Sequence, residues 1–338
     1  MIKGIILAVS LVFISGFFLS TPKREYTTMW YVNLDEINSS LFLEKITAYP
    51  PDMVLLTVYS ADDYFALNDT RINITHIAET LEKNNISYYW GFSLFSRPEL
   101  FARTSIYAAQ RKPVEGYYLP PGLNATVCPL YPEIQDYMIG IINQTLRFRK
   151  PAGLSFDHTR FFTFDEGFNP RCREWILSNY GLDIDNFTPT PMFILDQDGG
   201  IKWTNEDRIY YDSRAELIYQ CTKNITDKFS SYELLGTTMG ATEPARSAGQ
   251  YAELQGLLFD SMLLMTYDLD SKEISRNVAQ TSLLSKKQVI LGIHPFMNET
   301  VIFSNIKAGI DSGAKGIYLL GFNFTDPVLS AVSRKKVR

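Results

Sequence analysis

Eight apolar, strand-like runs alternate with helix-forming stretches along this chain of 338 residues, and the alternation leaves few folds open to it. Strands that are apolar along their whole length are typical of a parallel sheet covered by helices. Eight such units predict an α/β protein of the (β/α)8 TIM-barrel class rather than an open, doubly wound sheet. The expected strands lie at 27–34, 52–60, 86–95, 152–162, 232–241, 261–269, 288–296 and 316–324.

The stretches between these runs have the spacing of amphipathic helices. In 73–84, for example, Ile74, Ile77 and Leu81 fall on one helical face. The longest connection follows the fourth strand, where we expect a long insertion with helices at 169–181 and 207–229. A barrel needs about 250 residues, so residues 25–338 are expected to form a single domain.

Residues 1–24 differ from the rest of the chain. Lys3 precedes an uncharged apolar stretch, 4–20, which the sequence TPKREY follows. This pattern fits either a secretory signal peptide or a short N-terminal membrane anchor. Both alternatives predict a protein that is secreted or held on the extracellular face of the cell membrane.

Sites for N-glycosylation support export. Random placement of Asn and Ser/Thr would give roughly two or three N-x-[S/T] triplets. The expected sites are Asn38, Asn68, Asn73, Asn85, Asn124, Asn143, Asn224, Asn298 and Asn323. A tenth triplet, at Asn186, is the weakest because Pro189 follows it.

Charge and motifs exclude several classes of function. The net charge of −5 and the absence of an interior basic run argue against nucleic acid as a partner. No G-x-G-x-x-G or P-loop motif follows a strand, so no nucleotide cofactor is expected. The three cysteines lack C-x-x-C spacing, and the chain has only three histidines, so no metal is expected either. An odd number of cysteines allows one disulfide and a free thiol, and the sequence does not say which two pair.

The active site of a TIM barrel lies at the carboxyl ends of its strands, which gives a short list of candidates. The list is rich in carboxylates and aromatic residues, the combination that glycoside hydrolysis uses. We expect Asp157 to be the charged carboxylate and Glu243, Asp268 or, third, Glu166 to be the proton donor. The expected substrate-binding residues are Arg160, Tyr267, Trp30, Trp90, Trp203 and His294.

Asp157 and Arg160 stand together at the end of the fourth strand. Residues i and i+3 face opposite sides of a regular strand, so Arg160 is expected in the loop just beyond it, turned back over Asp157. An adjacent guanidinium favours the charged form of a carboxylate, which suits a base, nucleophile or electrostatic stabiliser. The alternative is an ion pair that only fixes the loop.

Two motifs resemble family-18 glycoside hydrolases, the chitinase-like barrels. LLMTYDL (263–269) is similar to their Met-x-Tyr-Asp strand end, and VILGIHPF resembles the strand that follows it. The resemblance implies that Tyr267 and Asp268 line a sugar site. The D-x-x-D-x-D-x-E strand of that family keeps one carboxylate here, Asp157, and has Thr159 in place of the catalytic Glu. FDHTRFF is closer to the fourth strand of a broader group of glycoside hydrolase-like barrels, and 169–184 and Arg214 resemble the insertion of that group.

The sequence therefore predicts an exported glycoside hydrolase-like barrel that acts on an oligo- or polysaccharide by carboxylate acid/base chemistry. The second hypothesis is a non-catalytic glycan-binding or cell-surface structural protein with the same fold. The third is a metal-dependent hydrolase or deacetylase that uses Asp157, His158 and His294. Carbohydrate is the expected partner, with membrane contact only through the N-terminal segment.

Overall fold

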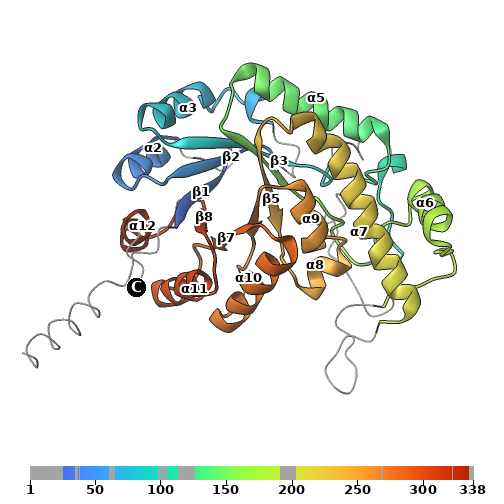
Figure 1. The fold of residues 1–338 in the computed structure, drawn as a ribbon. Helices are drawn as coiled ribbons and strands as arrows, with labels where there is room; N and C mark the ends of the chain where they lie inside the picture. Colours follow the sequence, from blue (N-terminus) through green and yellow to red (C-terminus); the bar gives the residue numbers. More distant parts are fainter. Residues whose placement is uncertain are drawn as a thin grey trace, which may run out of the picture.

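The computed structural model contains a closed barrel of eight parallel strands in the order β1 to β8, surrounded by helices (Figure 1). It describes residues 26–334 except 35–36, 38, 61–64, 98–99, 101–104, 113–125, 191–202, 268 and 322. The predicted (β/α)8 fold is confirmed. The strands are β1 (Thr27–Asn33), β2 (Met53–Tyr59), β3 (Ser87–Ser93), β4 (Gly153–Asp157), β5 (Glu233–Thr238), β6 (Ser261–Leu264), β7 (Gln288–Ile293) and β8 (Gly316–Leu320).

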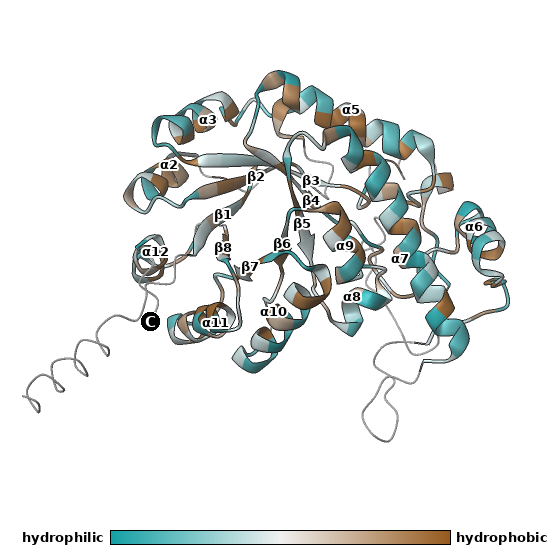
Figure 2. Ribbon diagram, viewed as in Figure 1, coloured by the Kyte–Doolittle hydropathy of each residue, from teal (hydrophilic) through white to brown (hydrophobic). Residues whose placement is uncertain are grey.

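Helices cover the outside of the barrel, and Figure 2 shows their apolar residues concentrated toward the strands. They are α2 (Ser39–Ala48), α3 (Ile74–Lys83), α5 (Pro132–Phe148), α6 (Pro170–Tyr180), α7 (Asn205–Thr226), α8 (Glu243–Ser247), α9 (Ala252–Leu258), α10 (Ser271–Ser285), α11 (Glu299–Asp311) and α12 (Asp326–Ser333). Between β4 and β5 the described part of the chain includes the helices α6 and α7. None of the described helices has both the length and the apolar composition that a membrane span needs.

Local sequence signals explain where several helices begin and end. Asn73 accepts a hydrogen bond from the amide of His76 and so caps α3, and Thr204 and Asp207 form a capping box at the start of α7. Gly181 is the C-cap of α6 with φ of 69°, a left-handed conformation that glycine adopts without strain.

Alternate residues along each strand point to the inside and the outside of the barrel. The outer side packs against the helices, as Trp30 does against Phe42 of α2, with ring centroids 6.2 Å apart. The inner side fills the barrel itself, so the barrel is a core and not a pore. Its buried apolar residues are Met29, Tyr31, Leu55, Tyr89, Leu235, Leu263, Ile290 and Tyr318.

All eight strands end earlier than the apolar runs predict, and the difference is largest at β4, β6 and β8. β4 ends at Asp157, β6 at Leu264 and β8 at Leu320, although the apolar sequence continues beyond each. At β4 the reason is visible in the backbone, because His158 has φ of 51°, a left-handed conformation that breaks the strand. The later residues, Arg160 and Tyr267 among them, therefore lie in loops at the mouth of the barrel.

The three cysteines are all buried in the described part of the chain. The Sγ atoms of Cys128 and Cys172 lie 2.6 Å apart, which brings together the segment before α5 and the first turn of α6. Both thiols are free in this structure, as is Cys221 on α7. The segment 1–24, for which a signal peptide or anchor is expected, lies outside the described residues.

Candidate functional site

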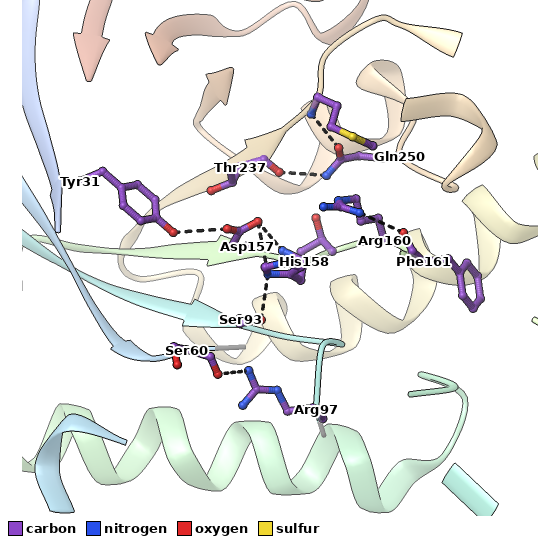
Figure 3. A network of polar contacts seen from close by, with 12 residues as sticks. Tyr31, Ser60, Ser93, Arg97, Asp157, His158, Arg160, Phe161, Thr237 and Gln250 are labelled. Atoms are coloured by element: carbon purple, nitrogen blue, oxygen red, sulfur yellow. Dashed lines mark hydrogen bonds and ion pairs between the residues drawn. The ribbon is translucent and has the colours of Figure 1, made fainter. Parts of the chain in front are cut away.

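Asp157 is the last residue of β4 and faces the interior at the mouth of the barrel. Its Oδ2 accepts a hydrogen bond from the Tyr31 hydroxyl at 3.3 Å, and its Oδ1 accepts one from the His158 amide at 2.6 Å (Figure 3). The His158 ring nitrogen Nδ1 lies 3.0 Å from Ser93 Oγ and 3.7 Å from Asp157 Oδ1. These contacts fix the carboxylate between β1, β3 and β4 while part of it stays accessible.

Tyr31 and two further tyrosines form a connected group beside Asp157. The Tyr31 ring lies 5.9 Å from the Tyr318 ring, and the Tyr318 and Tyr267 hydroxyls are 2.8 Å apart. Burial raises the pKa of Tyr31, and the negative charge of Asp157 raises it further. Burial likewise raises the pKa of Tyr267 and Tyr318. All three hydroxyls therefore keep their protons and remain hydrogen-bond donors at neutral pH.

Gly292 on β7 makes room for this group. A Cβ atom at this position would lie 2.3 Å from Cζ and 2.4 Å from the hydroxyl oxygen of Tyr318. A glycine is needed here because real Cβ atoms do not approach other atoms so closely. The missing side chain on β7 thus lets Tyr318 of β8 reach Tyr267 beyond β6.

Arg160 does not fold back over Asp157, which corrects the expectation from the sequence. Figure 3 shows its side chain on the other side of Asp157 from Tyr31, and no ion pair within the described residues joins Arg160 to a carboxylate. The guanidinium donates one hydrogen bond, from Nη1 to the Phe161 carbonyl at 3.3 Å, and the buried Nε atom has no partner. Burial lowers the pKa of Arg160, and the charges of Asp157 and Glu166 counteract this effect.

A cavity of about 750 Å3 opens beside Arg160 at the carboxyl ends of β5 and β6. Its size falls within the range of roughly 300–1,000 Å3 typical of small-ligand sites. The cavity brings together three residues predicted for the site, Arg160, Glu243 and Tyr267. The rest of its wall consists of Met239, Ala241, Thr242, Pro244, Met265, Thr266, Leu269, Glu273, Arg276, Asn277 and Gln280.

An aromatic row continues from the cavity wall toward solvent and consists of Tyr267, His294 and Phe296. The ring centroids of Tyr267 and His294 are 5.5 Å apart, and those of His294 and Phe296 are 4.5 Å apart. Phe296 is 89% exposed, which is unusual for a large apolar side chain. The Phe296 amide donates to His294 Nδ1 at 3.3 Å and so fixes the orientation of the imidazole.

A buried arginine, Arg214 of α7, holds the loop after β4 in place. Its guanidinium donates to the carbonyls of Thr163 at 2.5 Å, Phe164 at 2.9 Å and Ser247 at 2.5 Å. Glu166, the third candidate for the proton donor, is buried within the same loop. It accepts hydrogen bonds from the amides of Phe162 and Thr163, although burial raises its pKa. Glu166 therefore supports the loop and does not line the cavity.

The predicted tryptophans lie away from the mouth. Trp30 and Trp90 are buried on the outer side of the barrel, and Trp90 donates its indole N–H to the Arg149 carbonyl at 3.0 Å. Trp203 packs 4.6 Å from the Tyr211 ring in a separate cluster beside α6 and α7. Trp30 and Trp90 fill the protein core and offer no open face to a sugar, whereas Trp203 is partly buried in a cluster away from the cavity. Asp268 lies outside the described residues.

Several residues of the mouth were missed by the sequence reasoning. Tyr31 and Tyr318 lie inside strands whose two faces are both apolar, so nothing in the sequence marks them as inward-facing. Gln250 connects the segment after α8 to β5 through the Thr237 carbonyl and the Met239 amide (Figure 3).

Within the described residues no cluster of three or more His, Cys, Asp or Glu is arranged to hold a metal ion. Thr159 is buried against Gln255.

No protein-family model and no curated protein sequence matches this chain. Solved structures of similar fold do match. The glycoside hydrolase domain of PgaB (BpsB) from Bordetella bronchiseptica is 12% identical, with a TM-score of 0.69 over 91% of this chain and 98% of that domain. The catalytic domain of a β-amylase from Paenibacillus polymyxa is 11% identical, with a TM-score of 0.63 over 93% and 98%.

An α-L-fucosidase from Paenibacillus thiaminolyticus is also similar. It is 10% identical with a TM-score of 0.61, and the match covers 93% of this chain but 49% of the fucosidase. At such identities the likeness concerns the fold: this chain has a barrel of the kind found in glycoside hydrolases.

Proposed function

From this fold and the residues at its mouth, we propose that the protein is an exported glycoside hydrolase that cleaves an oligo- or polysaccharide. The observation that carries the proposal is the position of Asp157 at the carboxyl end of β4, near a cavity of about 750 Å3 that Arg160, Glu243 and Tyr267 line. Active sites of TIM-barrel enzymes lie at this end of the barrel. The fold shared with glycoside hydrolases supports the choice of carbohydrate as substrate.

The carboxylates and the aromatic row of the mouth have distinct roles in this proposal. Asp157, held by Tyr31 and the His158 amide, acts as base, nucleophile or electrostatic stabiliser of the positive charge that develops on the sugar. Glu243 donates the proton to the leaving oxygen, and Asp268 is the alternative donor. The aromatic row offers ring faces on which further sugars can stack, which favours a chain of sugars over a single one.

Replacement of Asp157 by Asn tests the assignment. Asn keeps the size and one hydrogen-bond acceptor but cannot be charged, so turnover should fall by about 10²- to 10⁴-fold. The measurement is release of reducing ends from a panel of glycans by wild type, Asp157→Asn and Glu243→Gln. Asp136→Asn is the matched control because Asp136 is exposed on α5, on the outside of the barrel. Undiminished turnover by Asp157→Asn would refute the catalytic role assigned to Asp157.

A glycan-binding protein without catalysis is the second candidate, and one observation favours it. The described carboxylates that line the cavity, Glu243 and Glu273, are both exposed, whereas the general acid of a glycosidase is usually desolvated. Binding of a glycan by both wild type and Asp157→Asn, with turnover by neither, would establish this second function.

A further inference from the structure

Arg160 is a charged side chain whose hydrogen-bonding capacity is largely unused. A guanidinium has five N–H donors, and within the described part of the chain Arg160 uses one of them, on a neutral carbonyl. Its buried Nε is among the few buried side-chain nitrogens there without a partner. An unpaired buried donor of a charged group is costly, so native structures normally satisfy it.

A second guanidinium lines the same cavity from another element. Arg276 on α10 is exposed and forms no ion pair with any described residue, and Asn277 and Gln280 lie beside it on the wall. The two arginines approach the cavity from the loop after β4 and from α10. Together they supply a set of N–H donors that form no ion pair with a described carboxylate, although Glu243 and Glu273 line the same cavity and the charges of Asp157 and Glu166 act on Arg160.

We propose that this cavity is a subsite for an acidic sugar, with Arg160 and Arg276 binding the carboxylate of a uronic acid residue. The inference rests on the proposed function and names the substrate class. A planar guanidinium matches a carboxylate with two parallel N–H···O hydrogen bonds. Such a ligand would give Arg160 the partner that the protein itself does not provide.

Two other uses of Arg160 fit the structure less well. A clamp on Asp157 requires an ion pair between them, and Asp157 instead uses its oxygens on Tyr31 and the His158 amide. A purely structural arginine resembles Arg214, whose guanidinium binds three carbonyls in the core. Arg160 binds one carbonyl, lies 5.6 Å from the Phe162 ring centroid and lines the cavity. The Nε atoms of both arginines lack a hydrogen-bond partner, so the two differ in the use of their terminal nitrogens.

The test compares sugars that differ only in the charged group. Binding of D-glucuronate, D-galacturonate and D-mannuronate, each paired with its neutral hexose, is measured by calorimetry or by NMR shift perturbation. At least one uronate should bind more tightly than its hexose. A charge-assisted hydrogen bond implies that Arg160→Gln weakens this binding by about tenfold or more. Arg276→Gln should weaken it by a smaller factor because Arg276 is more exposed.

Arg208→Gln is the matched control, since Arg208 is an exposed arginine of α7 outside the cavity wall. Circular dichroism and melting show whether Arg160→Gln is folded, and Arg276→Gln alone tests the subsite if it is not. Equal binding of uronates and hexoses, or a preference that survives both substitutions, would overturn the inference. Tighter binding of glucose 6-sulfate than of any uronate would overturn the choice of carboxylate.

The inference and the proposed function can fail separately. Turnover of neutral glycans without a preference for uronates would refute the subsite and leave hydrolysis intact. Arginine-dependent binding of a uronate without turnover of any glycan would support the subsite and refute hydrolysis.

Discussion

Tyr318 shows how a single side chain can connect the packed interior of the barrel to its mouth. It is fully buried on β8, contacts the Tyr31 ring, and its hydroxyl lies 2.8 Å from that of Tyr267. Through Tyr31 the same group reaches Asp157. The state of these tyrosines therefore affects both the stability of the barrel and the position of the carboxylate.

The raised pKa of the three tyrosines predicts a loss of stability in alkali. Above about pH 10 the tyrosines of the unfolded chain lose their protons, while Tyr31, Tyr267 and Tyr318 keep theirs in the folded protein. The folded state then binds more protons, so the free energy of unfolding falls as the pH rises, by at most about 1.4 kcal/mol per pH unit for each group.

Tyr318→Phe removes one of these groups and should make the decline shallower. Urea unfolding at pH 9, 10 and 11 measures the slope for wild type and variant. At neutral pH the variant should lose about 0.5–1.5 kcal/mol, the value of the hydrogen bond to Tyr267. Parallel slopes for the two proteins would contradict this account of Tyr318.

Individual residues also show what the sequence could and could not reveal about the site. Asp157, Arg160, Glu243 and Tyr267 were predicted to lie at the mouth because polar groups after apolar strands are conspicuous, and the structure places them at this end of the barrel. Trp30 was assigned to the mouth, whereas its neighbour Tyr31 contacts Asp157. In a strand buried on both faces, the apolar pattern does not tell which alternate residues point inward.

At the scale of elements, α7 holds the loop that follows β4. Arg214 of that helix binds carbonyls of the β4 loop and of the end of α8. Arg214→Met would remove the hydrogen bonds that these three carbonyls accept from the guanidinium. At about 1 kcal/mol or more for each, the variant should lose at least about 3 kcal/mol of unfolding free energy.

Hydrogen exchange shows which part of the structure Arg214→Met destabilises. Amides of 160–168 should exchange faster in Arg214→Met than in wild type, whereas those of β1 and β8 should be affected less. Arg208→Met, on the exposed side of the same helix, is the control and should match wild type in both measurements. Unchanged exchange in the β4 loop would show that Arg214 does not hold it.

The same loop explains why strand boundaries were predicted less accurately than strands. The apolar run after Asp157 continues because Phe161 is fully buried, with the Arg214 guanidinium 4.4 Å from its ring centroid. Burial is thus as deep in the loop as in the strand, and composition alone cannot separate them. The number, order and type of the eight strands follow from the sequence because each run must be covered on both faces.

For the whole molecule, glycosylation can be tested against the surface. The asparagines of the seven described acceptor triplets expected to be modified are all exposed: Asn68, Asn73, Asn85, Asn143, Asn224, Asn298 and Asn323. Asn73 and Asn298 cap helices through Oδ1, which leaves Nδ2 for a glycan. Expression in a glycosylating host followed by peptide mass spectrometry should find most of these sites modified.

Asn186 provides the internal comparison for this prediction. It is exposed like the others, but its triplet is followed by Pro189, so it should remain largely unmodified. Modification at Asn186 together with bare asparagines at most other sites would contradict the link between these triplets and export.

The direction of β1 determines which end of the barrel faces a support to which the protein is attached through its N-terminal side. The described chain begins at Tyr26, and β1 runs from there toward the mouth, in parallel with β2 and β8. Whatever is joined before Tyr26, whether a lipid-embedded segment, a biotin tag or a fusion partner, is therefore attached at the rim opposite the cavity. A protein immobilised through this end would present its cavity to the solution, and long polymers could reach it without passing the support.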